Sequence, residues 1–278
     1  KRDLASEMGA VGIVVLMKKE NYKKFKSRMK FHLLRKTTHI NNNKEGSGTV
    51  IPTFFLSENK ADKWLTKARG LKTPSKCRSA ATCPTGNLKA KWSHKIEKLH
   101  EEYTASNILA FLPGSDLELQ NELLIITSHY DHIGIIDGEI NNGADDDGSG
   151  TVTVLEIAES FVEAFKSGDG PRRAVLFMNV VGEEKGLLGS EWYSDNPIYP
   201  LENTIANLNI DMIGRVDEAH EGTENYIYLI GADKLSTDLH NISEEANNLY
   251  THLELDYTFN KPDDPNRFYY RSDHYNFA

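Results

Sequence analysis

The chain contains 278 residues, of which 39% are hydrophobic and 26% are charged. This balance supports one large or two modest folded domains, and it excludes disordered, collagen-like and disulfide-scaffold proteins. The longest uninterrupted apolar run, Val11–Met17, is far shorter than the roughly 20 residues that a membrane-spanning helix needs. We therefore expect a soluble protein with no membrane-spanning segment in this sequence.

The charge divides sharply near residue 100. The first 100 residues hold 23 Lys and Arg against 7 Asp and Glu, whereas the remaining 178 hold 9 basic and 34 acidic residues. Two units of different character are therefore expected. The basic run Lys18–Lys36 raises nucleic-acid binding as an alternative, but no nucleic-acid motif accompanies it and the acidic part of the chain would repel phosphates. We expect a solvated face here, and no nucleic-acid partner.

Two cysteines, Cys77 and Cys83, lie in the polar stretch Lys72–Thr85. Without a second pair they do not make a zinc knuckle. A local disulfide would suit an exported protein, and two free thiols fit the sequence equally well. The cysteines therefore leave the redox compartment open.

The first 75 residues alternate between β and α patterns. Val11–Leu16 and Val50–Leu56 are typical of short strands, and Ser57 is placed to cap a helix that ends near Gly70. The Lys-, Pro-, Ser- and Thr-rich stretch Leu71–Leu88 predicts a loop near a domain boundary. We expect a small α/β domain over residues 1–90.

Residues 91–278 carry a longer alternation of strands and amphipathic helices. Asn107–Leu112 and Glu122–Ser128 predict a hairpin that enters a central sheet. Gly150–Lys166 is apolar on one helical face and leads into the strand Ala174–Val181, which makes a β–α–β unit. Further elements are expected at Thr204–Ile210 (strand), Tyr226–Ile230 (strand) and Ser236–Tyr250 (polar helix). This alternation predicts an α/β fold with a mainly parallel sheet sandwiched by helices.

Imidazole and carboxylate groups follow the predicted strands or precede the long helix. They are His129 and Asp131, Asp145–Asp147, Glu183 and Glu184, and Asp211. Ligands of open parallel sheets bind beyond the carboxyl ends of the strands, so we expect these side chains to meet at one edge. Each alone is more typical of a surface pair or a helix cap. Together they would repel one another unless cations bound there, and mixed nitrogen and oxygen ligands suit zinc.

Five motifs resemble those of the co-catalytic zinc aminopeptidases and carboxypeptidases, a family that also includes the transferrin receptor ectodomain and the glutaminyl cyclases. They are HYDHIG (129–134), GADDDGSG (143–150), GEEKGLLGS (182–190), NIDMIGR (209–215) and RSDH (271–274), in the family's order and spacing. The resemblance implies the zinc exopeptidase fold for a catalytic domain over residues 91–278. The stretches Ser6–Leu16 and Ile51–Ser57 are similar to the protease-associated domain of many members, which implies that domain for residues 1–90.

The resemblance also implies two zinc ions and their ligands. His129 and Glu184 would bind one zinc, Asp211 would bind the other, and Asp146 would bridge both. Asp146 is preferred to its two aspartate neighbours because of its distance from the Ser149–Gly150 pair that follows.

Glu183 and Asp131 take the catalytic roles in this resemblance. A carboxylate beside two cations, but not bound to them, can accept a proton from the water that attacks a peptide bond, and this is the role implied for Glu183. Alone, Glu183 would be interpreted as an acid at a helix N-terminus. Asp131 would accept the second N–H of His129, because a metal-bound imidazole usually donates that N–H to a carboxylate. The implied activity is exopeptidase action on peptide substrates, with an aminopeptidase favoured.

The sequence departs from the family pattern at its end. The family has a further histidine ligand beyond the Ser-Asp-His motif, whereas Ala278 closely follows that motif here. We therefore expect a chain incomplete at both ends, whose second zinc site is weak. His132 and His274 are the nearby histidines that could substitute, and for His274 a supporting or a purely structural role is equally expected.

Two other functions use the same scaffold. A receptor-like binding protein would have lost its ligands, and the four retained ligands together with Glu183 argue against it. A glutaminyl cyclase, a transferase that uses one zinc, would not be expected to carry the basic domain. The resemblance implies a secreted or periplasmic location, while side-chain preference, aminopeptidase against carboxypeptidase specificity, metal identity and oligomeric state are left open.

Overall fold

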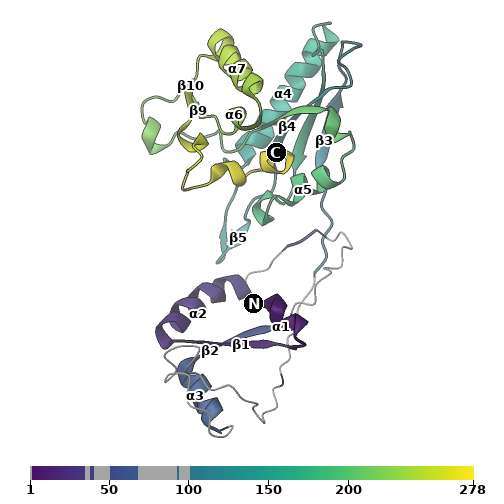
Figure 1. Ribbon diagram of the computed structural model, residues 1–278. Coiled ribbons are helices and arrows are strands. Elements are labelled where there is room, and N and C mark those ends of the chain that lie inside the picture. Colours follow the sequence, from purple (N-terminus) through teal and green to yellow (C-terminus); the bar gives the residue numbers. More distant parts are fainter. Residues whose placement is uncertain (1, 35–37, 41–50, 68–92, 94–100) are drawn as a thin grey trace. The chain divides into compact units, whose positions relative to one another are not determined.

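The computed structural model describes residues 2–34, 38–40, 51–67, 93 and 101–278. The chain divides into two compact units, Lys1–Glu101 and Glu102–Ala278 (Figure 1). The domain boundary expected after residue 90 falls outside the described residues, as do Cys77 and Cys83. The position of that boundary and the state of the cysteines therefore stay predictions.

The first unit contains a two-stranded parallel sheet. Strand β1 (Ile13–Met17) pairs with β2 (Thr53–Ser57), and the paired residues run from Ile13 opposite Thr53 to Met17 opposite Ser57. Its helices are α1 (Arg2–Glu7), α2 (Lys19–Leu34) and α3 (Glu58–Lys67). The sequence pattern predicted both strands and α3 but not α2. The resemblance to a protease-associated domain stays a prediction.

The part of the basic run from Lys19 to Leu34 forms α2. Tyr22, Phe25 and Met29, three or four residues apart, are half-buried, while the lysines between them are exposed. The ring of Phe25 packs 4.3 Å from that of Phe55 in β2. The apolar residues therefore hold this helix on the small sheet, and the basic residues form its solvated face.

The second unit is built on a four-stranded sheet with the strand order β3-β7-β4-β8. The strands are β3 (Ile108–Leu112), β4 (Leu123–His129), β7 (Ala174–Val180) and β8 (Thr204–Asn209). β4 pairs in parallel with both β7 and β8, and β3 pairs with β7 in the antiparallel direction. The predicted mainly parallel sheet is confirmed.

The predicted hairpin of β3 and β4 is wrong, because β7 lies between them. The connection between the two strands packs against the residues that precede β7. Arg172 Nη2 lies 2.8 Å from Asp116 Oδ2, and the backbone N–H of Ser115 donates to Pro171. A Cβ at Gly114 would lie 2.5 Å from the carbonyl oxygen of Arg172. This close approach of the two backbones joins the start of β7 to the β3–β4 connection.

Helices cover both faces of this sheet, as predicted. α4 (Gly148–Lys166) packs on one face and contributes to a core cluster that contains Phe177 of β7. α5 (Leu188–Asp195) packs on the other face, where Tyr193 joins a cluster that contains Leu176. Successive β7 residues therefore point to opposite faces, as a strand buried on both sides requires.

The remaining strands and α-helices of the second unit are short. They are β5 (Ile135–Ile136), β6 (Glu139–Ile140), β9 (Tyr226–Tyr228), β10 (Glu254–Asp256), α6 (Ala232–Leu235) and α7 (Thr237–Ala246). The strand expected near Tyr226 pairs with β10 in a two-stranded sheet of its own. No helix in the described part of the chain is long and apolar enough to cross a membrane.

Truncation of Leu176 tests the packing of the central sheet. The side chain is fully buried, so Leu176→Ala should lower the free energy of unfolding by about 2–5 kcal/mol through lost apolar contact and a residual cavity. The matched control is Leu155→Ala on α4, where the side chain is 57% exposed and a change within about 0.5 kcal/mol is expected. Similar losses for both variants in chemical denaturation would contradict this packing.

Candidate metal centre

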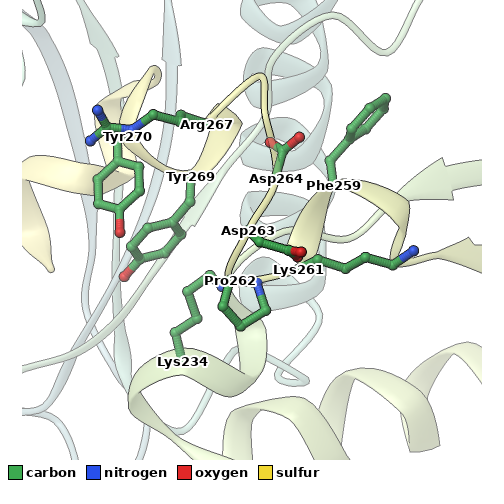
Figure 2. Close-up of a pocket in the computed structure, with 9 residues that line it drawn as sticks. All are labelled: Lys234, Phe259, Lys261, Pro262, Asp263, Asp264, Arg267, Tyr269 and Tyr270. Atoms are coloured by element: carbon green, nitrogen blue, oxygen red, sulfur yellow. The ribbon is translucent and has the colours of Figure 1, made fainter.

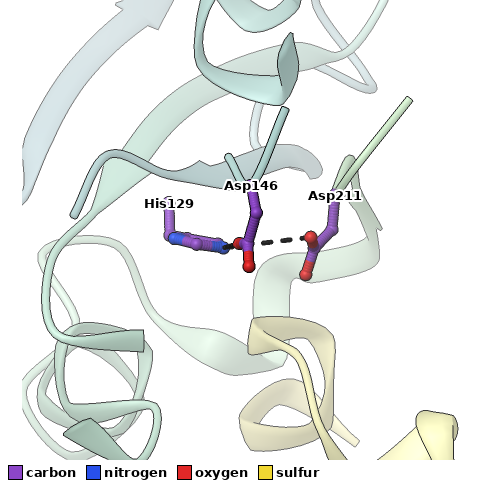
Figure 3. Close-up of side chains that lie close together, drawn as sticks. All are labelled: His129, Asp146 and Asp211. Atoms are coloured by element: carbon purple, nitrogen blue, oxygen red, sulfur yellow. Dashed lines mark ion pairs between the residues drawn. The ribbon is translucent and has the colours of Figure 1, made fainter. Parts of the chain in front are cut away.

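Four segments bring imidazole and carboxylate side chains to the carboxyl edge of the central sheet. His129 is the last residue of β4, and a short 3₁₀ turn, Glu183–Lys185, follows β7. Asp211 lies two residues beyond β8, and Asp146 lies in the loop before α4. In Figure 3 the side chains of His129, Asp146 and Asp211 point toward one another. Parallel strands end at the same edge, and this gathers residues that are far apart in the sequence.

His129, Asp146 and Asp211 form the first group of candidate ligands. His129 Nε2 lies 3.2 Å from Asp146 Oδ1 and 3.8 Å from Asp211 Oδ1. Tetrahedral zinc with bonds of about 2.0–2.1 Å would separate its ligand atoms by about 3.3–3.4 Å, so these atoms are spaced to share one ion. The imidazole is 1% exposed, and its Nε2 has no partner in hydrogen-bonding geometry. A metal ion would satisfy this buried nitrogen.

His132, Asp146 and Glu184 form the second group. His132 Nδ1 lies 3.0 Å from Glu184 Oε1 and 3.9 Å from Asp146 Oδ2. Asp146 therefore directs one oxygen to each group, which is the geometry that a bridging carboxylate needs.

The pairing of the other ligands differs from the one that the resemblance implied. His129 lies with Asp211 rather than with Glu184. The carbonyl oxygen of Asp131 lies 3.0 Å from His129 Nδ1, which directs the opposite nitrogen of the ring toward Asp211 beyond β8. Glu184 follows β7, on the other side of β4, and its nearest imidazole in these groups is that of His132.

The neighbours of Asp146 are engaged with the backbone. Asp147 is buried and accepts hydrogen bonds from three backbone N–H groups, one of them that of His129. Asp145 accepts the backbone N–H of Gly214 at 2.7 Å. Of the three consecutive aspartates, Asp146 is the one directed at the imidazoles, and this supports its choice as the candidate bridging ligand.

Asp131 connects the segments that carry His129 and Glu183. Its carboxylate lies 3.8 Å from His129 Nδ1, farther than its own carbonyl oxygen. The two carboxylate oxygens instead accept the backbone N–H groups of Glu183 at 3.1 Å and of Glu184 at 3.4 Å. The expected link to His129 is thus made by the backbone of Asp131, while its side chain orients the turn with the two glutamates.

Glu183 lies beside the first group without belonging to either. Its Oε2 is 4.0 Å from His129 Nε2. Burial raises the pKa of Glu183 to about 8, although the charge of His129 acts in the opposite direction. A bound cation would lower this raised pKa, because it favours the ionised carboxylate.

The electrostatics of this edge favour positive charge. Burial alone would lower the pKa of His129, but the neighbouring Asp211 carboxylate raises it to about 10. Burial alone would raise the pKa of Asp211, yet interactions with His129 and Ser272 hold it below its usual value. The negative charge of these carboxylates would also attract a metal cation. The imidazole must lose a proton to bind the cation, because only a neutral ring nitrogen can act as a ligand.

Three polar residues orient Asp211, and sequence reasoning missed them. Ser272 Oγ donates to Asp211 Oδ2 at 2.6 Å, Asn209 Nδ2 donates to Ser272 Oγ at 2.8 Å, and Thr127 Oγ1 donates to Asn209 Oδ1 at 2.7 Å. The chain of hydrogen bonds starts on β4 and leaves the other Asp211 oxygen directed at His129. Asn209 belongs to the NIDMIGR motif and Ser272 to the RSDH motif. Their place in these motifs was the sequence signal that could have identified them.

His274 belongs to neither group. Its ring centroid lies 5.4 Å from that of Tyr269, and burial lowers its pKa. Tyr269 also lines a cavity in the carboxyl-terminal part of the chain (Figure 2). Aromatic and charged side chains share this cavity: Lys234, Phe259, Lys261, Asp263, Asp264, Arg267 and Tyr270. His274 thus packs against one of the residues that line this cavity.

Removal of the Ser272 hydroxyl tests the orientation of Asp211. Loss of a hydrogen-bond partner of a metal ligand typically costs 10–100-fold in affinity, so Ser272→Ala should weaken zinc binding by about that factor. Ser243→Ala is the control, because that hydroxyl bonds to Leu239 within α7. Zinc titration against a competing chelator measures both, and equal affinities would contradict the role of Ser272.

Comparison with known proteins identifies the family. Residues 107–278 match the family model described as "Peptidase family M28". The chain is 28% identical over 172 residues to "Probable glutamate carboxypeptidase AMP1" of Arabidopsis thaliana, covering 58% of this chain and 22% of that protein. It is 32% identical over 122 residues to "Probable leucine aminopeptidase" of Arthroderma otae, covering 43% of this chain and 33% of that protein.

Among solved structures, a zinc aminopeptidase from Bacillus subtilis matches with a TM-score of 0.42 and 26% identity, over 54% of this chain and 33% of that one. The chain thus spans between about a fifth and a third of the length of these relatives. The family model, by contrast, covers more than half of the chain and contains all the residues of both candidate groups. The chain belongs to peptidase family M28.

Proposed function

We propose that this protein is a zinc-dependent exopeptidase that hydrolyses N-terminal peptide bonds. The observation that carries the proposal is Asp146, shared by two imidazole–carboxylate groups, with Glu183 beside them. The leucine aminopeptidase and glutamate carboxypeptidase among its relatives support the same class of activity. A receptor-like protein without ligands is not favoured, because the imidazoles and carboxylates of both groups are present.

The two groups would hold two zinc ions. His129, Asp146 and Asp211 would bind the first, while Asp146 and Glu184 would contribute to the second, and mixed nitrogen and oxygen donors of this kind fit zinc. When bound, zinc polarises a peptide carbonyl and lowers the pKa of the attacking water.

Glu183 is the proposed general base. Its carboxylate would accept the proton of the attacking water and pass it to the leaving amine. It lies close to the first group but outside it, so its oxygens would remain available for the proton. Asp131 fixes the backbone of Glu183, and the positive charge at the centre would keep Glu183 ionised at neutral pH.

The cavity that Tyr269 lines is the proposed place for part of the peptide substrate. It lies in the chain segment that leads to Ser272, which supports Asp211. Aromatic rings and charged side chains together suit a peptide, which presents both apolar and charged groups. The location outside the cytoplasm that the resemblance implied stays a prediction.

Substrate assays on the zinc-loaded full chain test this function. Aminoacyl and dipeptide substrates should release their N-terminal amino acid, and N-acetylated versions should resist hydrolysis. Carboxyl-terminal release from blocked peptides would instead indicate a carboxypeptidase. Cyclisation of N-terminal glutaminyl peptides without hydrolysis would replace the proposal with a glutaminyl cyclase.

The two adjacent glutamates should respond differently to the same substitution. Glu183→Gln cannot accept a proton, so turnover should fall by about 10²–10⁴-fold while bound zinc stays unchanged. Glu184→Gln should instead lower the zinc content, because it removes a charged ligand. Metal analysis and turnover of both variants check this. If Glu183→Gln lost metal and Glu184→Gln kept it, the two roles would have to be exchanged.

Zinc binding should release a proton from His129. The pKa of this imidazole lies near 10 in the metal-free protein, so it is protonated at neutral pH and must become neutral to bind metal. The cation would also lower the pKa of Glu183, which is about 8 without metal, so Glu183 contributes to the proton release and zinc affinity should rise by at least about tenfold per pH unit between about pH 6 and pH 7.5. Calorimetric titrations in buffers of different ionisation enthalpy count the protons. A pH-independent affinity would contradict the charged state of His129.

A further inference from the structure

We propose that the β5–β6 hairpin is a peptide-binding surface whose paired isoleucines contact an apolar side chain of the substrate, two or three residues beyond the cleaved bond. This inference rests on the proposed function and deepens it, because it names the substrate class. The substrate would be an oligopeptide with an apolar residue at that position rather than a dipeptide. The hairpin shares no residue with the cavity that Tyr269 lines, so it would bind a different part of the peptide.

The hairpin carries two isoleucines side by side on one face. Ile135 of β5 lies opposite Ile140 of β6 in the antiparallel pairing, and the side chains of directly opposite residues lie on the same face. Each of these two side chains is 70% exposed. The turn between the strands consists of Asp137 and Gly138, both with positive φ, as the tight two-residue turns of hairpins require. The turn thus fixes the register that places the two isoleucines together.

The base of the hairpin is anchored, whereas its apolar face lies in water. Within the described part of the chain, β5 and β6 form a two-stranded sheet of their own, and such a hairpin alone is only marginally stable. At its base the carbonyl oxygen of Gly134 accepts the backbone N–H of Asn141 at 2.9 Å and the side-chain amide of Asn141 at 3.0 Å. Gly143 then passes so close to His132 that a Cβ there would lie 2.9 Å from the imidazole Cγ. The anchors leave the two isoleucines uncovered, and a contiguous apolar face in water marks a binding surface.

The reach of the hairpin matches an extended peptide bound at the candidate metal centre. Ile135 follows His132 by three residues, so their Cα atoms are at most about 10 Å apart. An extended peptide advances about 3.3 Å per residue, so a side chain level with the isoleucines lies about two or three residues from the bond at the centre. When an N-terminal bond is cleaved, only the part of the peptide beyond that bond is long enough to span this distance. In Figure 1 the hairpin with β5 projects away from the central sheet, where that part of the peptide would leave the centre.

The charge of the hairpin favours a peptide over other apolar occupants. Asp137 and Glu139 lie at its tip, and the sequence between His132 and Gly143 has no lysine or arginine. A second copy of the chain would bring the same negative charge, because residues 101–278 contain 34 acidic and only 9 basic residues. An anionic lipid surface would be repelled for the same reason. A peptide with a free amino terminus carries a positive charge and meets no such repulsion.

Binding of uncleavable peptides to the zinc-loaded full chain tests this surface. The probes are fluorescent pentapeptides whose first peptide bond is reduced to CH₂–NH. One has alanine at every position, and the other has leucine at the third and fourth positions, which are the second and third beyond the reduced bond. The unmodified chain should bind the leucine peptide about tenfold more tightly, which is the lower end of the range for a small apolar difference in a pocket. In the Ile135→Ser/Ile140→Ser variant this preference should disappear, and anisotropy titrations measure it.

Two controls isolate the contribution of the hairpin. Ile198→Ser removes an isoleucine that is 69% exposed and lies between α5 and β8, so it should leave the leucine preference unchanged. A dipeptide with the same reduced bond lacks the residues that would reach the hairpin, so the unmodified chain and both variants should bind it equally. Zinc titration and circular dichroism check that the hairpin variant keeps its metal and its fold.

The remaining outcomes separate the inference from the proposed function. A leucine preference that is absent from the unmodified chain, or that survives in the hairpin variant, would overturn the inference and leave the proposed function standing. An equal loss of dipeptide binding would also overturn it, because the hairpin would then act on the metal centre rather than on the peptide.

Other occupants of the hairpin have their own signatures. A dimer of the unmodified chain that dissociates in the hairpin variant, seen by sedimentation velocity, would assign the isoleucines to a second copy instead. Binding to phosphatidylserine vesicles that is lost in the variant would assign them to a lipid surface. An unmodified zinc-loaded chain that bound neither the pentapeptides nor the dipeptide would remove the proposed function, and this inference with it.

Discussion

The hydrogen-bonded register of β4 between β7 and β8 is the constraint on which the candidate centre depends. His129 lies opposite Val180, and Thr127 lies opposite Asn209. These pairings place the turn with Glu183 and the loop with Asp211 within a few residues of the imidazole. A shift of one residue in either pairing would turn alternate side chains to the other face of the sheet and separate these groups. The register of the buried strands therefore sets the positions of Glu183 and Asp211, which lie just beyond the strand ends.

The carboxylates at this edge divide into two kinds by what their oxygens accept. Asp147 and Asp131 accept backbone N–H groups from neighbouring loops and so hold those loops together. Asp146 and Glu184 face imidazoles instead. The first kind determines where the second kind lies, because most of its hydrogen bonds join segments that are far apart in the sequence. Carboxylates packed this closely repel one another unless some take up protons or nearby positive charge offsets the repulsion, and a bound cation would supply that charge.

Much of the fold could be predicted from local pattern, and the failures in the second unit share one cause. Apolar runs located β4, β7 and β8, and the polar residues that follow them located His129, Glu183 and Asp211. The order of strands could not be predicted in this way. β3 was expected beside β4, but it pairs with β7, and the ion pair of Asp116 with Arg172 joins the β3–β4 connection to the start of β7. A strand pattern tells which residues are buried, not which strand is the neighbour. The grouping of the ligands and the hydrogen bonds that orient Asp211 depend on that long-range order.

A short turn directs the two adjacent glutamates at different imidazoles. The 3₁₀ turn begins after Gly182 and ends at Gly186, both with positive φ, so the chain can enter and leave it sharply. Three residues per turn place consecutive side chains about 120° apart. Glu183 is thereby directed toward His129 and Glu184 toward His132. One segment, held by Asp131, thus delivers one carboxylate to a group of candidate ligands and leaves its neighbour beside them, where the proposed general base has to lie.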